Sequence, residues 1–226
     1  MNIERVWVVS TYNQDPSDVI ADLVGDWVIY NQGDPARVPA TLKADKSFRQ
    51  MQHTGHNLSD YLAFILENYD DLPAEVGLAK GNLFPRHISR DKFLDRQAEG
   101  GFQPLYGDTA TFAPNFHKLF FWRLVSQQVM PGLYLEQNNN WYLKTRKRGK
   151  HYQTFDDLHR KIFDRSSPRY ILFTPGACML VPSAHILRWP KELYAHLYDI
   201  VSYTFFPVEA FHVERMMFAL LGATPR

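Results

Sequence analysis

The sequence predicts an α/β domain whose sheet is mostly parallel and covered by helices on both faces. Two short runs, Arg5–Ser10 and Asp26–Tyr30, consist almost entirely of β-branched, aromatic and other apolar residues. Such continuous apolar runs are typical of strands that are buried on both faces. A short helix is predicted between them at residues 17–23, and alternation of strands with helices favours parallel pairing. We expect residues 1–226 to form a single domain.

The most informative stretch of the chain lies between Gly55 and His87. Asn57 or Ser59 is suited to the N-cap of a helix, because a short side-chain oxygen can accept from the free N–H groups of the first turn. Apolar residues then recur at three- and four-residue spacing, which predicts one buried helix face. Pro73 ends this helix, since proline cannot continue it.

A third strand is predicted at Val76–Ala79, and it leads into the polar turn Lys80-Gly81-Asn82. In open α/β sheets, ligands bind beyond the carboxyl ends of the strands. Polar residues that follow the first three strands, or that begin the helix before the third, are therefore candidate substrate-binding residues. They are Thr11, Asn13, Asn31, Asn57, Lys80, Asn82 and His87. The alternative is ordinary turn chemistry, which is common for asparagine.

The second half of the chain is predicted to add further helices and strands. Residues 88–115 contain several glycines and prolines, so we expect them to be irregular. Helices are predicted at Phe116–Gln127, Thr154–Phe163, Ser183–Arg188, Pro190–Tyr203 and Val208–Leu221, and strands at Leu133–Leu135, Tyr170–Phe173 and Cys178–Val181. Thr154 with Asp157 three residues later resembles a capping box.

The overall composition excludes several classes of protein. The formal net charge of +1 indicates neither a nucleic acid nor an acidic membrane surface as a partner. The chain has no run of 18 apolar residues and no signal-peptide pattern, so we expect no transmembrane segment and a cytoplasmic location. Its one cysteine, Cys178, lies in an apolar run typical of a core position.

One local run of basic residues lies in a predicted loop. It comprises Lys144, Arg146, Lys147, Arg148 and Lys150. Charge runs of this kind are usually solvated surface. The alternative is a loop that closes over a diphosphate.

Three fragments carry a resemblance to known proteins. They are NLSDYLAFILENYDDLP at residues 57–73, GACMLVPSAHILRWPKELY at residues 176–194 and HVERMMFALLG at residues 212–222. Together they resemble a family defined by a domain of unknown function. More distantly, the chain is similar to glycosyltransferases of the GT-A type, which bind a nucleotide-sugar on a Rossmann-like half sheet.

The resemblance implies that the two parts of the chain bind different substrates. A nucleotide-sugar donor would bind on the side formed by residues 1–90, and a glycan-type acceptor on the side formed by residues 91–226. GT-A enzymes usually carry an Asp-x-Asp motif that binds Mn²⁺ or Mg²⁺. This chain has Lys80-Gly81-Asn82 at that place, so the sequence assigns no metal ligand. Lys80 would instead supply the positive charge.

The last predicted helix holds the best acid–base group of the sequence: Glu209, His212 and Glu214. A carboxylate near the acceptor hydroxyl can take its proton as the glycosidic bond forms. If the enzyme retains the anomeric configuration, these residues would position the substrate. A simple surface ion pair is the alternative.

Two functions from different classes therefore follow from the sequence. The first is a glycosyltransferase that moves a sugar from a nucleotide-sugar to a hydroxyl acceptor. The second is a non-catalytic nucleotide- or sugar-binding module on the same fold.

Overall fold

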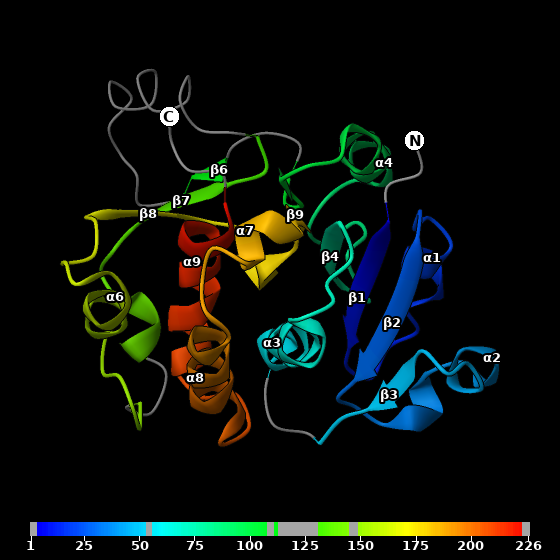
Figure 1. Cartoon of the computed structure of the whole chain (residues 1–226), viewed down its shortest axis with the longest axis horizontal. Helices are drawn as coiled ribbons and strands as arrows, with labels where there is room; N and C mark the ends of the chain where they lie inside the picture. Colours follow the sequence, from blue (N-terminus) through cyan, green and yellow to red (C-terminus); the bar gives the residue numbers. More distant parts are fainter. Residues whose placement is uncertain (1–3, 53–55, 108–110, 113–130, 145–148, 223–226) are drawn as a thin grey trace.

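The computed structural model of the chain describes residues 4–52, 56–107, 111–112, 131–144 and 149–222. Its centre is a six-stranded sheet in the order β3-β2-β1-β4-β9-β5 (Figure 1). Strands β1 (Arg5–Thr11), β2 (Asp26–Asn31), β3 (Phe48–Gln50) and β4 (Glu75–Lys80) are parallel neighbours. Strand β9 (Met179–Pro182) runs antiparallel to β4 and to the short β5 (Gln103–Pro104). The predicted α/β architecture with a mostly parallel sheet is therefore confirmed.

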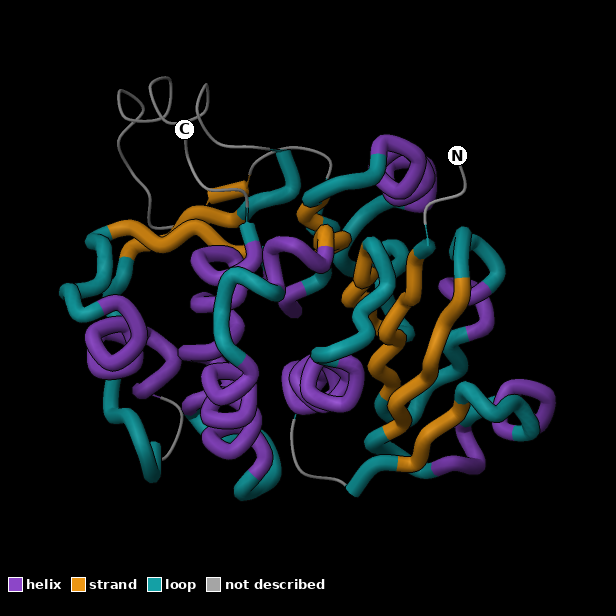
Figure 2. Tube along the Cα trace, in the orientation of Figure 1, coloured by secondary structure: helices purple, strands orange, loops and turns teal. Residues whose placement is uncertain are grey.

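Helices cover both faces of this sheet, as predicted. On one face α3 (Asn57–Asn68) packs against β1, followed by α8 (Lys191–Ser202) and α9 (Glu209–Leu221) (Figures 1 and 2). On the other face lie α1 (Ser17–Ile20) and α4 (Arg90–Glu99). Neighbouring residues of β1 alternate between the two cores, with Val8 on the α3 side and Trp7 on the α4 side. This alternation explains why the strand is apolar at successive positions.

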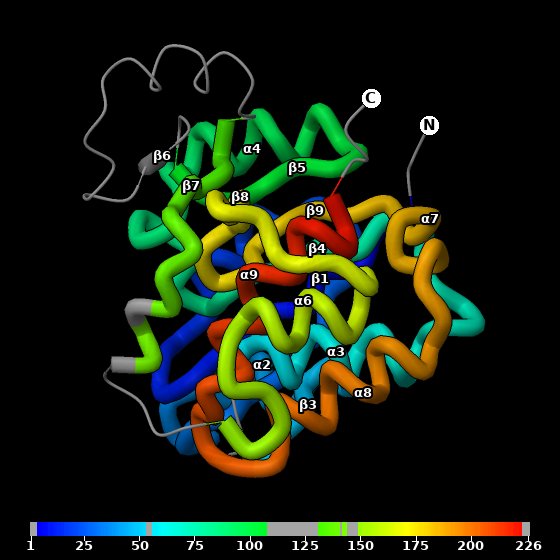
Figure 3. The backbone as a smooth tube through the Cα atoms, turned by 90° about the vertical axis from the view of Figure 1, so that its left-hand side faces the viewer, coloured from blue at the N-terminus to red at the C-terminus, as the bar shows by residue number. Residues whose placement is uncertain are grey.

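A small second sheet lies beside α9 and has the order β6-β7-β8 (Figure 3). It is formed by β6 (Thr111–Phe112), β7 (Tyr134–Gln137) and β8 (Tyr170–Phe173). Helix α6 (Phe155–Phe163) precedes β8, and Thr154 and Asp157 form the predicted capping box. The expected helix at Phe116–Gln127 lies outside the described residues.

Short elements complete the chain: the 3-10 turns η1 (Pro35–Arg37), η2 (Trp141–Lys144) and η3 (Pro175–Ala177), and the helices α2 (Ala40–Lys43) and α7 (Ser183–Ile186). No helix within the described ranges is both long and apolar enough to span a membrane.

Helix α4 corrects the expectation that residues 88–115 are irregular. Only one of its side chains, Phe93, is a fully buried apolar anchor, packed against the rings of Trp7 and Phe84. Gly100, with φ at +66°, follows its last turn. Its other anchors are polar: buried Arg96 donates to the Gly107 carbonyl and buried Gln97 to the Asp22 carbonyl. The helix therefore shows no apolar periodicity and is stabilised by tertiary contacts.

Candidate functional site

A pocket of about 330 Å³ lies where the strand order of the large sheet reverses. From β1 the chain builds outward to β2 and β3, and then returns to place β4 on the other side of β1. Loops that leave β1 and β4 therefore diverge, and such a switch point is where doubly wound sheets bind ligands. We call this cavity the switch pocket. Its lining residues are Ser10, Thr11, Tyr12, Gln14, Gln32, His56, Asn57, Lys80, Arg86, Phe205 and Phe206.

The switch pocket is positively charged. Lys80 and Arg86 line it, whereas no aspartate or glutamate of the described residues does. Within the described residues, neither Lys80 nor Arg86 forms a hydrogen bond or an ion pair with a carboxylate. The N-terminus of α3, at His56 and Asn57, reaches the same pocket and adds the partial positive charge of a helix start. The pocket is therefore suited to an anionic ligand.

The floor of the switch pocket offers hydrogen-bond acceptors. Asp60 is fully buried beneath it and accepts from Ser10 Oγ at 2.5 Å and from Gln32 Nε2 at 2.6 Å. Burial raises the pKa of Asp60 to about 7, although these hydrogen bonds favour the charged form. Because the Ser10 hydrogen points to Asp60, its lone pairs remain for a ligand. Asn57 donates to the Gly176 carbonyl at 2.6 Å, and its Oδ1 has no hydrogen-bond partner within the described part of the chain.

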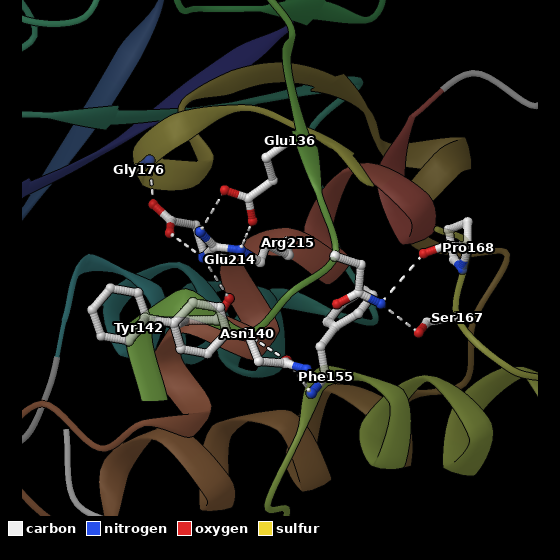
Figure 4. A network of polar contacts seen from close by, with 11 residues as sticks. Glu136, Asn140, Tyr142, Phe155, Ser167, Pro168, Gly176, Glu214 and Arg215 are labelled. Carbon is white, nitrogen blue, oxygen red and sulfur yellow. Dashed lines mark hydrogen bonds and ion pairs between the residues drawn. The ribbon is translucent and has the colours of Figure 1, made fainter. Parts of the chain in front are cut away.

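The turn that precedes β9 closes one side of the site. Gly176 has φ at +74°, and a Cβ there would lie 3.1 Å from Lys80 Cδ and from His87 Cε1. Only glycine fits this position without strain. Glu214 accepts from the Gly176 N–H at 2.6 Å and from Arg215 Nη1 at 3.3 Å (Figure 4). Glu214 therefore holds the turn that contacts Lys80 and His87.

The structure brings together only some of the predicted site residues. Thr11, Asn57 and Lys80 line the switch pocket, and His87 lies beside it at the Gly176 turn. Asn82 follows in the turn after β4, and its Oδ1 has no partner among the described residues.

Two further predicted residues hold loops at this edge of the sheet. Asn31 is fully buried and donates to the Gly33 carbonyl and to Gln50. Asn13 accepts from the Asp34 N–H at 2.7 Å. Neither of the two lines the switch pocket.

Glu209 and His212 lie deeper in the fold than Glu214. Glu209 is fully buried, accepting from the His151 N–H at 2.7 Å and from the Tyr203 hydroxyl at 3.0 Å. His212 is also fully buried beside Tyr142, and burial lowers its pKa to about 4. Of the predicted basic loop, residues 145–148 lie outside the described part, and Lys150 stacks over the Tyr203 ring.

Several lining residues were not predicted from the sequence. Arg86 could have been inferred from its position in the turn after β4. No sequence pattern indicates that Ser10 and Gln32 belong to the site, because their role depends on the buried Asp60. Phe205 lies in the segment between α8 and α9, so only the tertiary fold places it beside Tyr12, with the ring centroids 6.5 Å apart.

No group of three or more histidine, cysteine, aspartate or glutamate side chains in the described ranges is arranged to hold a metal ion. Comparison of the chain with protein-family models, curated proteins and solved structures gave no match. The resemblance to GT-A glycosyltransferases therefore stays a prediction.

Glu214 accepts from two donors, the Gly176 N–H and Arg215 Nη1. We expect Glu214→Gln to reduce the free energy of unfolding by about 1–3 kcal/mol, because the amide N–H group would then face one of these donors. Urea denaturation measures this change, with exposed Glu192→Gln as the control. Unchanged stability with turnover reduced by about 10²-fold would instead show that Glu214 is a general base.

Proposed function

We propose that this protein is a glycosyltransferase that binds a nucleotide-sugar in the switch pocket and moves the sugar to a hydroxyl acceptor. The observation that carries the proposal is the pocket at the strand reversal, lined by Lys80 and Arg86 and, within the described ranges, by no carboxylate. A diphosphate needs such a cationic site. The start of α3 adds backbone N–H groups of the kind that bind phosphate.

The remaining lining suits a nucleoside. Tyr12 and Phe205 are 49% and 53% exposed, so their rings offer stacking surface for a planar base. Ser10 presents an acceptor to N–H or O–H groups of a base or ribose. The pocket thus offers an acceptor for a neutral hydrogen-bond donor as well as cations for an anion.

In the proposed reaction, the bond between the anomeric carbon and the diphosphate oxygen breaks, and a bond to the acceptor oxygen forms. The acceptor hydroxyl passes its proton to the departing diphosphate, whose oxygen keeps the electron pair of the broken bond. Negative charge develops on the departing diphosphate, where Lys80 and Arg86 would stabilise it. These two side chains would thereby supply the charge that a metal supplies in enzymes with an Asp-x-Asp motif.

The second candidate is a non-catalytic nucleotide- or sugar-binding module. Both oxygens of Glu214 accept hydrogen bonds, as do both oxygens of Glu209. A carboxylate that is fully engaged is a poor general base unless a bond opens, and this favours the module.

Thermal unfolding with a ligand panel tests the proposal. The panel contains UDP, GDP, CDP and ADP, their common nucleotide-sugars and free sugars, each with Mn²⁺ or with a chelator. A nucleotide at 100 times its Kd stabilises the fold by about 2.7 kcal/mol. For a domain of this size we expect the melting temperature to rise by about 5–10 °C.

Release of nucleoside diphosphate in the presence of hydroxyl acceptors then separates the two candidates. Transfer to an acceptor supports the enzyme, whereas a thermal shift without turnover supports the module. If no nucleotide or nucleotide-sugar shifts the melting temperature, the proposed function is wrong.

A further inference from the structure

Asp60 places a carboxyl group beneath the switch pocket, among neutral hydrogen-bonding groups. The residue is fully buried, with Ser10 Oγ donating to its Oδ2 at 2.5 Å and Gln32 Nε2 donating to its Oδ1 at 2.6 Å. Both donors line the switch pocket. Within the described ranges, no cation forms an ion pair with Asp60. A buried carboxylate in such surroundings lacks the partner that normally stabilises its charge.

The network determines which oxygen of Asp60 can carry a proton. Gln32 Nε2 also donates to Ser59 Oγ at 2.7 Å and faces the His56 carbonyl at 3.4 Å, so the amide nitrogen is the group that faces Oδ1. A proton therefore belongs on Oδ2, between Asp60 and Ser10. In that state Asp60 donates to Ser10 Oγ, and the hydroxyl hydrogen of Ser10 rotates toward the pocket.

The two protonation states give the floor of the pocket opposite properties. With Asp60 charged, Ser10 can only accept, and the buried negative charge repels an anion above it. With Asp60 protonated, Ser10 can donate and the repulsion is absent. A ribose hydroxyl donates as well as accepts, so it pairs with Ser10 in either state, and the charge of a diphosphate decides which state binds. Burial raises the pKa of Asp60 to about 7, so the proton is available near neutral pH.

We propose that Asp60 is a positioning residue that acts through Ser10: its carboxyl group takes up one proton when the diphosphate binds, and Ser10 then donates to a phosphate oxygen. The inference rests on the proposed function. Ser10 of β1 is the sheet partner of Lys80 of β4, so Ser10 lies beside the residue assigned to the diphosphate. The proton comes from solvent and stays on Asp60 Oδ2, and no covalent bond of the ligand changes.

Other titratable side chains lie near Asp60 on the elements packed around it. Three are tyrosines that remain neutral around pH 7, because burial raises the pKa of each: Tyr30 of β2, Tyr61 of α3 and Tyr198 of α8. Glu67 of α3 and Glu214 of α9 form ion pairs with arginines. Burial lowers the pKa of His87, beside the pocket, to about 4, so it is neutral as well. A change of charge around neutral pH is therefore assigned to Asp60.

The pH dependence of nucleotide-sugar affinity tests this assignment. UDP-glucose and GDP-mannose are the probes, because neither phosphate of a nucleotide-sugar has a second acidic proton. If the protonated protein is the form that binds, affinity follows the protonated fraction of Asp60. Titration calorimetry should then give a Kd about tenfold higher at about pH 8 than at about pH 6. At the higher pH, buffers with different heats of ionisation should reveal uptake of about one proton per ligand.

Asp60→Asn reproduces the protonated state, because its amide nitrogen can donate to Ser10 Oγ while its oxygen accepts from Gln32. Its affinity should be independent of pH and close to the wild-type value at about pH 6, with no proton uptake. Its melting temperature at about pH 8 should be no lower than that of the wild type, because burial disfavours the charged carboxylate. His56 also lines the pocket, and histidine titrates near neutral pH. The control His56→Gln should therefore retain the wild-type ratio of affinities between the two pH values.

Three results would contradict a role for Asp60. They are a wild-type affinity that does not change with pH, a wild-type pH dependence retained in Asp60→Asn, and a pH dependence lost in His56→Gln. Each would overturn this inference while leaving nucleotide binding intact. If Asp60→Asn does not fold, absence of proton uptake by the wild type is sufficient to overturn it. Failure of the wild-type protein to bind either probe would overturn both proposals.

Discussion

Glu136→Leu should reduce the free energy of unfolding by about 3–5 kcal/mol, the usual cost of removing one partner from a buried ion pair. Glu136 on β7 accepts from Arg215 Nε at 2.5 Å and from its Nη2 at 3.2 Å, and both side chains are at most 6% exposed (Figure 4). The guanidinium also lies 4.6 Å from the ring centroids of Tyr142 and Phe173. Leucine would leave this cation buried with only the carboxylate of Glu214 nearby among the described residues.

Urea denaturation measures the change, and the chain offers a matched control. Asp95 forms an ion pair with Lys92 at 3.1 Å, but these side chains are 61% and 50% exposed. Asp95→Leu should therefore change the free energy of unfolding by at most about 1 kcal/mol. The double variant Glu136→Leu/Arg215→Met should recover much of the lost stability, because it leaves no buried charge unpaired. A loss below 1 kcal/mol for Glu136→Leu alone would contradict this account.

The central strands could be predicted because burial on both faces requires apolar residues at successive positions. Strands β1, β2 and β4 are covered on both faces, so the residues between their polar ends are apolar. The edge strands β3 and β5 contain no apolar run, because Phe48–Gln50 and Gln103–Pro104 are short and largely polar. Their pairing depends on the neighbouring strand and not on their own propensity.

The candidate site was predictable only where position along the chain implies position in space. Lys80 and Thr11 end adjacent parallel strands, so the sequence places both at one edge of the sheet. Phe205 reaches the same pocket through tertiary packing alone, and no local pattern indicates that. Asp60 was hidden for a different reason: it lies on the apolar face of α3, where only the contacts with Ser10 and Gln32 explain a buried carboxyl group.

The sequence pattern also left the roles of the C-terminal helix open. Residues 209, 212 and 214 are close in sequence, yet a helix turns successive side chains toward different neighbours. Glu209 contacts the segment around His151, whereas Glu214 contacts Gly176. Spacing along one helix therefore did not determine whether these groups share a site.

Lys80→Met should weaken binding of a nucleoside diphosphate by about 10- to 100-fold, which corresponds to about 1.5–3 kcal/mol for hydrogen bonds to a charged group. Lys80 ends β4 and lines the switch pocket, and its Cδ would lie 3.1 Å from a Cβ at Gly176, so the stem of the side chain is confined beside the proposed diphosphate position. Methionine keeps most of the side-chain volume and removes the charge. Titration calorimetry with UDP and GDP measures the loss, and Lys46→Met, at an exposed lysine outside the pocket, is the control.

Two further arms of the same titration identify the source of the charge that binds the diphosphate. Added salt should weaken binding to the wild-type protein more than binding to Lys80→Met, because salt screens the attraction that the variant lacks. If Lys80 and Arg86 replace a metal ion, a chelator should have less effect on affinity than Lys80→Met. A large effect of chelator combined with unchanged affinity of Lys80→Met would show that a metal ion binds the diphosphate. Lys80 would then line the pocket without binding the ligand.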